Sequence, residues 1–136
     1  MSASVTIRMR NKVAGTMILG VDPGKTGGFA ILSERDGVLL EPMPLDQYGE
    51  LDVAEIGRWL GDWKNEIRVA VIEKVNAAPI KGRRQGTTSM FNFGVSFGIV
   101  LGAVGALKIP VKLVRPQEWT GQLHRGLPKT LDAKTR

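Results

Sequence analysis

Short apolar runs alternate with glycine-containing turns in the first third of the chain, and this pattern predicts strands. Residues 17–21 are continuously apolar, residues 29–33 follow the glycine-rich segment 23–28, and residues 38–43 follow the Asp36-Gly37 pair. Glycine-rich turns between apolar runs are typical of β-hairpins. We therefore expect a three-stranded antiparallel meander.

The spacing of apolar residues changes in the rest of the chain. Between residues 52 and 63 they recur every three or four positions, which predicts a helix. Residues 69–73 are continuously apolar up to a final glutamate, as expected for a strand between two neighbours. A helix is expected at 89–107 and a strand at 109–114, and Pro116 is expected in the first turn of a short helix. The order β-β-β-α-β-α-β predicts an α/β fold with a mixed sheet flanked by helices.

The second predicted helix is unusually apolar, since residues 90–107 carry no charge and approach the length of a membrane span. Asn92 and Ser96 dilute it, and each glycine weakens a helix in water by roughly 0.5–1 kcal/mol. Four glycines fall on one face, at positions 94, 98, 102 and 105. Such a face lets another backbone approach closely, here the sheet or a second copy of the helix. We therefore expect a buried core helix and no membrane contact, with Phe91, Phe93 and Phe97 in the core.

Composition limits the possible chemistry. The 136 residues suffice for one domain with a single core, which we place at residues 17–136 after a basic, flexible extension at 1–16. The absence of cysteine excludes disulfides and thiolate zinc sites, and is compatible with the cytoplasm, where we expect the protein. His124 is the one histidine, so a histidine-rich metal site is excluded.

The net charge of +6 is unevenly distributed along the chain. Residues 26–73 carry ten acidic and four basic side chains, whereas residues 74–136 carry eleven basic and two acidic ones. A basic half of this kind suits a polyanion such as nucleic acid, although a solvated basic face is an alternative. The segment 76–88 adds a glycine-containing basic loop, which is either a solvated surface loop or a phosphate contact. Its cations are Lys81, Arg83 and Arg84.

Two predicted strands each end in an acid, Asp22 before Pro-Gly and Glu73 before Lys74. Acidic residues are depleted in strands and are seldom buried without a partner or a metal. If the strands are neighbours, the two carboxylates lie side by side and repel each other, and a divalent cation relieves the repulsion. Clustered carboxylates hold Mg²⁺ in phosphate chemistry. The alternatives are a turn-capping role for Asp22 and a strand-end salt bridge for Glu73.

Two nucleotide-binding interpretations of the Asp22 region fail. Gly24-Lys25-Thr26 lacks the glycine that a P-loop requires five positions earlier, where Leu19 stands. A sugar-kinase or actin-like phosphate corner needs a second domain, for which 136 residues leave no room. Lys25 itself is either a phosphate contact or a solvated turn lysine.

Four motifs in order, over roughly residues 17–125, resemble the RuvC-type Holliday-junction resolvases, most closely the branch found in bacteriophages and their hosts. They are Leu19-Gly-Val-Asp22-Pro-Gly, Val71-Ile-Glu73-Lys74, Ser89-Met-Phe-Asn-Phe-Gly94, and Ile109-Pro-Val with Pro116-Gln-Glu-Trp119.

The resemblance implies an RNase H-like fold with a five-stranded sheet, a homodimer formed through the helix at 89–107, and cleavage of branched DNA that depends on Mg²⁺ or Mn²⁺. Asp22 and Glu73 match the family's metal ligands on the first and fourth strands. The resemblance also places the basic segment 81–84 at the junction. Lys74 and Lys25 are further candidate DNA contacts.

The sequence departs from the family pattern at its C-terminal end. The family carries further catalytic aspartates on a C-terminal helix, usually in an Asp-His-x-x-Asp-Ala-like stretch, and no such stretch follows Trp119. His124 has no acid beside it, and Asp132 resembles the segment before that helix. The alternatives are therefore a resolvase whose further acids come from elsewhere, a branched-DNA-binding protein without catalysis, and a fragment of a nucleotide-binding phosphotransferase.

Overall fold

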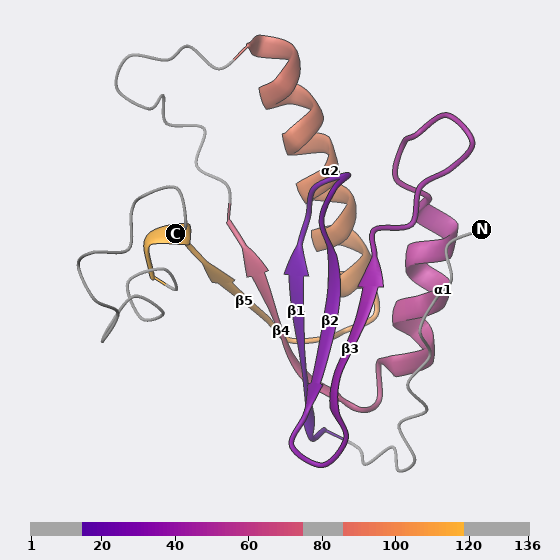
Figure 1. Ribbon diagram of the computed structural model, residues 1–136, viewed down its shortest axis with the longest axis vertical. Helices are drawn as coiled ribbons and strands as arrows, with labels where there is room; N and C mark the ends of the chain where they lie inside the picture. Colours follow the sequence, from indigo (N-terminus) through magenta and orange to yellow (C-terminus); the bar gives the residue numbers. More distant parts are fainter. Residues whose placement is uncertain (1–14, 75–85, 119–136) are drawn as a thin grey trace, which may run out of the picture.

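A computed structural model of the chain describes residues 15–74 and 86–118, which form five strands and two helices (Figure 1). The strands are β1 (Met17–Asp22), β2 (Gly28–Ser33), β3 (Gly37–Pro42), β4 (Ile67–Glu73) and β5 (Val111–Val114). The helices are α1 (Val53–Trp63) and α2 (Thr87–Ala106). The predicted order of elements is confirmed, and residues 116–118 are helical, as the position of Pro116 predicts.

The five strands form one mixed sheet in the order β3-β2-β1-β4-β5. β1, β2 and β3 are antiparallel neighbours, and the turn between β2 and β3 contains Gly37 at φ +84°, a conformation that favours glycine. β4 pairs parallel with β1 on one side and with β5 on the other. The chain thus makes a meander and then adds two strands through helical crossovers, as predicted.

Both helices pack on the same face of the sheet (Figure 1). α1 begins at Asp52, whose side chain accepts a hydrogen bond from the Glu55 backbone N at 3.0 Å, and it buries Ile56 and Leu60. α2 buries Ser96, Val100 and Val104, which recur every four residues along one stripe. The sheet contributes alternate residues to this core, including Leu19 and Val21 of β1, Ile31 of β2, and Ala70 and Ile72 of β4.

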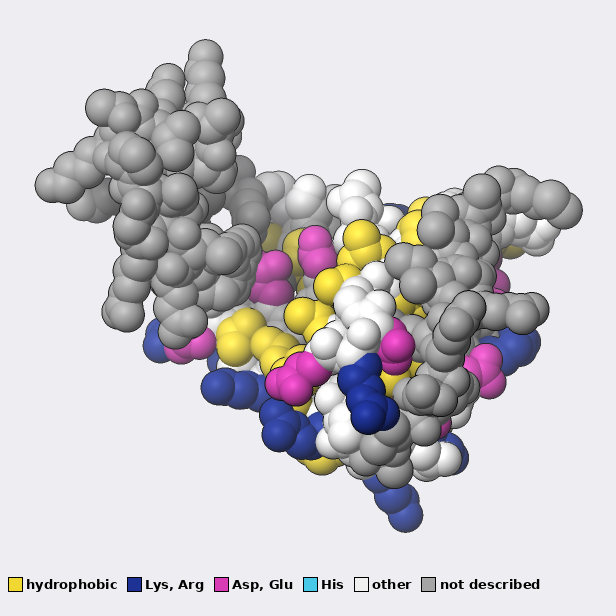
Figure 2. Space-filling model, turned by 60° about the horizontal axis from the view of Figure 1, so that its bottom comes forward, with side chains coloured by type: hydrophobic (Ala, Val, Ile, Leu, Met, Phe, Trp, Pro, Cys, Tyr) yellow, Lys and Arg dark blue, Asp and Glu magenta, His cyan; other side chains and the backbone are white. Residues whose placement is uncertain are grey.

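The opposite face of the sheet is covered by neither helix, and we call it the open face. It carries the alternate residues of each strand, such as Ile18 in β1 and Val69 in β4, which are paired in register. Leu32, Val38 and Leu40 on this face are 44%, 45% and 68% exposed. A cavity of about 520 Å³ lies over its lower part, lined partly by Ile18 and Leu32. Figure 2 shows hydrophobic side chains exposed between charged ones when the lower end of the molecule comes forward.

α2 differs from the expected core helix, because only one side of it is packed. Phe97 contacts the core, but Phe91 is 70% exposed, so its predicted place in the core is wrong. The buried stripe starts at Ser96, and the N-terminal part of the helix extends beyond it. The four glycines are exposed, and a Cβ atom on any of them would meet nothing within 4 Å among the described residues. By length and composition α2 is also a candidate membrane span, of which 17% is buried in the structure.

Candidate metal and nucleic-acid site

The parallel pairing of β1 and β4 brings Asp22 and Glu73 to the same end of the sheet. Val21 pairs with Ile72, and the two acids are the next residue on each strand. Neighbouring strands lie about 4.8 Å apart, so the two residues are adjacent. Because Val21 and Ile72 point into the core, the following residues point to the other side. Both acids therefore belong to the open face, as the sequence predicts for neighbouring strands.

Neither carboxylate has a structural partner in the part of the chain that the structure describes. No hydrogen bond or ion pair links Asp22 or Glu73 to another described side chain, although Asp22 is exposed and Glu73 is only half-buried. This arrangement gives no support to a turn-capping role for Asp22 or to a salt bridge for Glu73. Two adjacent carboxylates without partners remain available to bind a cation.

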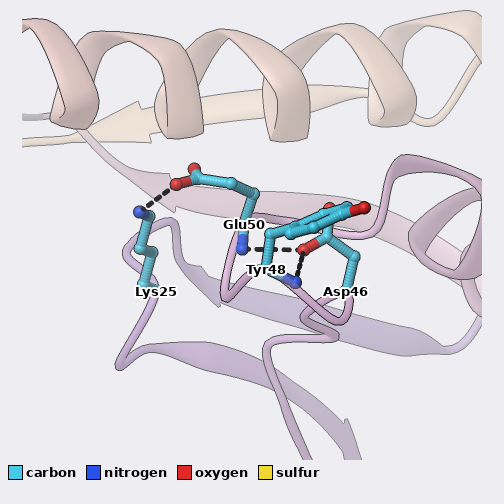
Figure 3. A network of polar contacts seen from close by, with 4 residues as sticks. All are labelled: Lys25, Asp46, Tyr48 and Glu50. Atoms are coloured by element: carbon cyan, nitrogen blue, oxygen red, sulfur yellow. Dashed lines mark hydrogen bonds and ion pairs between the residues drawn. The ribbon is translucent and has the colours of Figure 1, made fainter.

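The turn after Asp22 is tied down on both sides. Buried Pro23 starts it, the Gly27 backbone N donates to the Gly24 carbonyl oxygen at 3.0 Å, and the Gly27 carbonyl oxygen accepts from the Met43 backbone N at 3.0 Å. Lys25 Nζ lies 2.8 Å from Glu50 Oε1, in an ion pair whose side chains are 36% and 61% exposed (Figure 3). Exposed pairs of this kind contribute only about 0–1 kcal/mol.

Glu50 belongs to a tight loop between β3 and α1. The Asp46 backbone N donates to the Glu50 carbonyl oxygen at 2.7 Å, and Asp46 Oδ1 accepts from the Tyr48 and Glu50 backbone N atoms at 2.8 and 3.0 Å (Figure 3). The sequence did not indicate this contact, because Lys25 and Glu50 are far apart in the chain. The role of Lys25 in DNA binding remains a prediction, and the structure shows the lysine paired with a carboxylate.

Among the predicted DNA contacts, Lys74 is exposed directly after β4, and its backbone N donates to the Val114 carbonyl oxygen at 2.7 Å. Lys81, Arg83 and Arg84 lie outside the described residues. The structure adds Lys112, which the sequence analysis missed. Lys112 is exposed and pairs with Val71, and so occupies the open face one pair before Glu73 and Val114. A lysine at an alternate position of a strand parallel to β4 was the available signal.

The donor set fits a magnesium-like ion. Mg²⁺ takes oxygen ligands and is commonly held by one or two carboxylates together with water and substrate phosphate. Asp22 and Glu73 supply two such carboxylates on one face. No group of three or more acidic, histidine or cysteine residues suited to a metal occurs among residues 15–74 and 86–118. The described residues thus provide two protein ligands for the metal.

Comparison of the sequence with known protein families and with curated proteins finds no match. The structure is similar to that of Thermus thermophilus RuvC in complex with a Holliday junction substrate, with a TM-score of 0.54 and 16% identity. The match covers 80% of this chain and 72% of that protein. Thermus thermophilus RuvC in a second structure gives a TM-score of 0.48 and 20% identity, over 82% of this chain and 68% of the other.

The chain has a RuvC-type fold. The sequence resemblance to this family therefore predicted the architecture correctly, including the mixed five-stranded sheet with flanking helices. Within the RuvC-type fold, Asp22 and Glu73 are the two acids at the ends of adjacent parallel strands.

Proposed function

We propose that the protein is a structure-selective endonuclease that resolves four-way or otherwise branched DNA, of the branch found in bacteriophages and their hosts, and that it acts in the cytoplasm. The observation that carries this proposal is the placement of Asp22 and Glu73 on one face, at the ends of adjacent parallel strands of a RuvC-type fold. The basic C-terminal half of the chain supports a polyanionic substrate.

In this proposal the two carboxylates hold Mg²⁺ or Mn²⁺. The metal, when bound, supplies positive charge that stabilises the phosphodiester transition state and favours attack by water. Asp22 and Glu73 position that charge at the edge of the open face. Lys74 and Lys112 neutralise DNA phosphates next to the acids, together with Lys81, Arg83 and Arg84. Recognition then depends on the shape of the branch and on its backbone rather than on base sequence.

We propose further that α2 forms a homodimer with its counterpart in a second copy. The exposed glycine face of the helix, which lies opposite the buried stripe, supports this interpretation, because nothing among the described residues covers it. Glycines at four-residue spacing allow two helices to approach closely. A two-fold dimer would present two acid pairs, which suits the symmetry of a four-way junction.

A branched-DNA-binding protein without cleavage activity is the second candidate. It is favoured by the absence of a third metal-binding side chain within the described ranges. The two candidates share a substrate and differ only in whether a phosphodiester bond is broken.

The proposal is tested with the purified chain on a four-way junction and on a linear duplex of the same sequences. We expect preferential junction binding in EDTA, and nicking of the junction that requires Mg²⁺ or Mn²⁺. Tight junction binding with no product in either metal would select the second candidate. Equal affinity for the two DNAs would contradict both, and stabilisation by ATP without junction affinity would point to a phosphotransferase fragment.

The phosphate contacts predict a salt effect. Replacing Lys74 or Lys112 by Ala should weaken junction binding and reduce the slope of log affinity against log salt concentration by about 1 for each lysine. Lys64→Ala is the matched control, because Lys64 is exposed after α1 and precedes β4, whose far end carries Glu73. Fluorescence anisotropy over a salt series measures the slopes. An unchanged slope for Lys74→Ala and Lys112→Ala would exclude these lysines as phosphate contacts.

A further inference from the structure

Gly27 has no room for a side chain, and the atoms that occupy the space belong to Asp22. A Cβ atom placed on Gly27 would overlap the carbonyl oxygen of Asp22 and would lie 2.8 Å from its Cγ. Real Cβ atoms essentially never approach other heavy atoms so closely. Any residue other than glycine at this position must therefore displace Asp22 or its own turn.

Two neighbouring glycines in the same hairpin behave differently. A Cβ on Gly24 would meet its nearest atom, Asp22 Oδ1, at 3.9 Å, which is an ordinary contact. A Cβ on Gly28 would overlap the carbonyl oxygen of Glu41 and lie 3.2 Å from the Pro42 Cα, both in β3. The three positions thus separate a substitution without a clash, a clash with β3 and a clash with Asp22.

The turn has little freedom to absorb the clash at Gly27. Its far side is held by the bond from the Met43 backbone N to the Gly27 carbonyl oxygen and by the Lys25–Glu50 ion pair. Pro23 is buried at its start. Asp22, by contrast, is exposed and has no partner among the described side chains, so its carboxylate is the group that is free to move.

We infer that Gly27 is a positioning residue, which sets the place of the Asp22 carboxylate relative to Glu73. This inference rests on the proposed metal site. Its physical basis is that metal ligands must be placed to within a few tenths of an ångström, and a displacement of about 1 Å in a catalytic group can cost about a hundredfold in rate. A methyl group at position 27 is large enough to cause such a displacement.

The test compares Gly27→Ala, Gly24→Ala and Gly28→Ala with the wild type. Mn²⁺ binding is measured without DNA, by electron paramagnetic resonance of free Mn²⁺, and thermal unfolding is followed on the same samples. We expect Gly27→Ala to weaken Mn²⁺ binding about tenfold or more while still unfolding cooperatively. Gly24→Ala should stay within about twofold of the wild type. Gly28→Ala should lower the Tm but keep Mn²⁺ affinity within about threefold, because its clash is with β3.

Other outcomes would overturn the inference. Equal losses of Mn²⁺ affinity in Gly27→Ala and Gly28→Ala, or a Gly27→Ala chain that does not fold, would mean that Gly27 serves the hairpin as a whole. Unchanged affinity in Gly27→Ala, together with a loss in Asp22→Asn, would overturn the role of Gly27 and leave the proposed metal site standing. A wild-type chain that binds no Mn²⁺ would overturn both.

Discussion

Replacing Asp22 by Asn, or Glu73 by Gln, is expected to reduce the rate of junction cleavage about a hundredfold or more. Each change keeps the shape of the side chain and removes one of the two negative charges that hold the cation. A bound metal contributes several kcal/mol of transition-state stabilisation, and each 1.4 kcal/mol corresponds to a factor of ten in rate. Junction affinity in EDTA should stay the same or increase slightly, because the protein becomes less negative next to DNA phosphates.

Glu34→Gln is the matched control for these variants. Glu34 is an exposed acid that follows β2, at the end of the sheet opposite to Asp22 and Glu73. The rates come from single-turnover cleavage of a labelled four-way junction with saturating Mg²⁺ or Mn²⁺. If the Asp22 and Glu73 variants cleave as fast as the control, the activity arises elsewhere and the proposed site is wrong.

Substituting Gly98 by Leu should convert a homodimer into a monomer, or weaken it about tenfold or more. Gly98 lies in the middle of the exposed glycine face of α2, and a leucine there fits the isolated chain because nothing among the described residues lies within 4 Å of its Cβ position. In a closely packed helix pair the same side chain would separate the two backbones. Sedimentation equilibrium over a range of protein concentrations measures the change.

Gly57→Leu in α1 is the control, since Gly57 is also a helical glycine with nothing within 4 Å of its Cβ position. Leucine has a higher helix propensity than glycine by about 0.8–1.0 kcal/mol, so neither substitution should unfold its helix. The control is expected to keep the oligomeric state of the wild type. A dimer that tolerates leucine at position 98 would contradict the proposed interface, as would a wild-type chain that is monomeric.

Local patterns were sufficient to predict most of the fold. The runs around residues 17–43 predicted a meander because alternating burial and glycine turns act over a few residues, and Gly37 at φ +84° shows one such turn. The acid pair was also predictable. Both acids end apolar strands, and a parallel neighbour relation is enough to bring such residues together.

Tertiary packing decided what the sequence could not. The apolar stretch of α2 predicts burial, but composition does not reveal how far a helix extends beyond its sheet, and Phe91 is exposed for this reason. The Lys25–Glu50 pair depends on the place of a loop that is remote in sequence. The position of Lys112 beside the acids depends on the register of β5 against β4, which no local pattern fixes.

Mn²⁺ binding to the DNA-free chain tests most directly whether Asp22 and Glu73 share one ion. Affinities are measured for the wild type, Asp22→Asn, Glu73→Gln and the double variant. We expect each single variant to lose about tenfold or more, and the double variant to lose much less than the sum of the two losses in free energy, because both carboxylates serve the same ion. Losses in free energy that add in full, or single variants that bind Mn²⁺ as tightly as the wild type, would contradict a shared site.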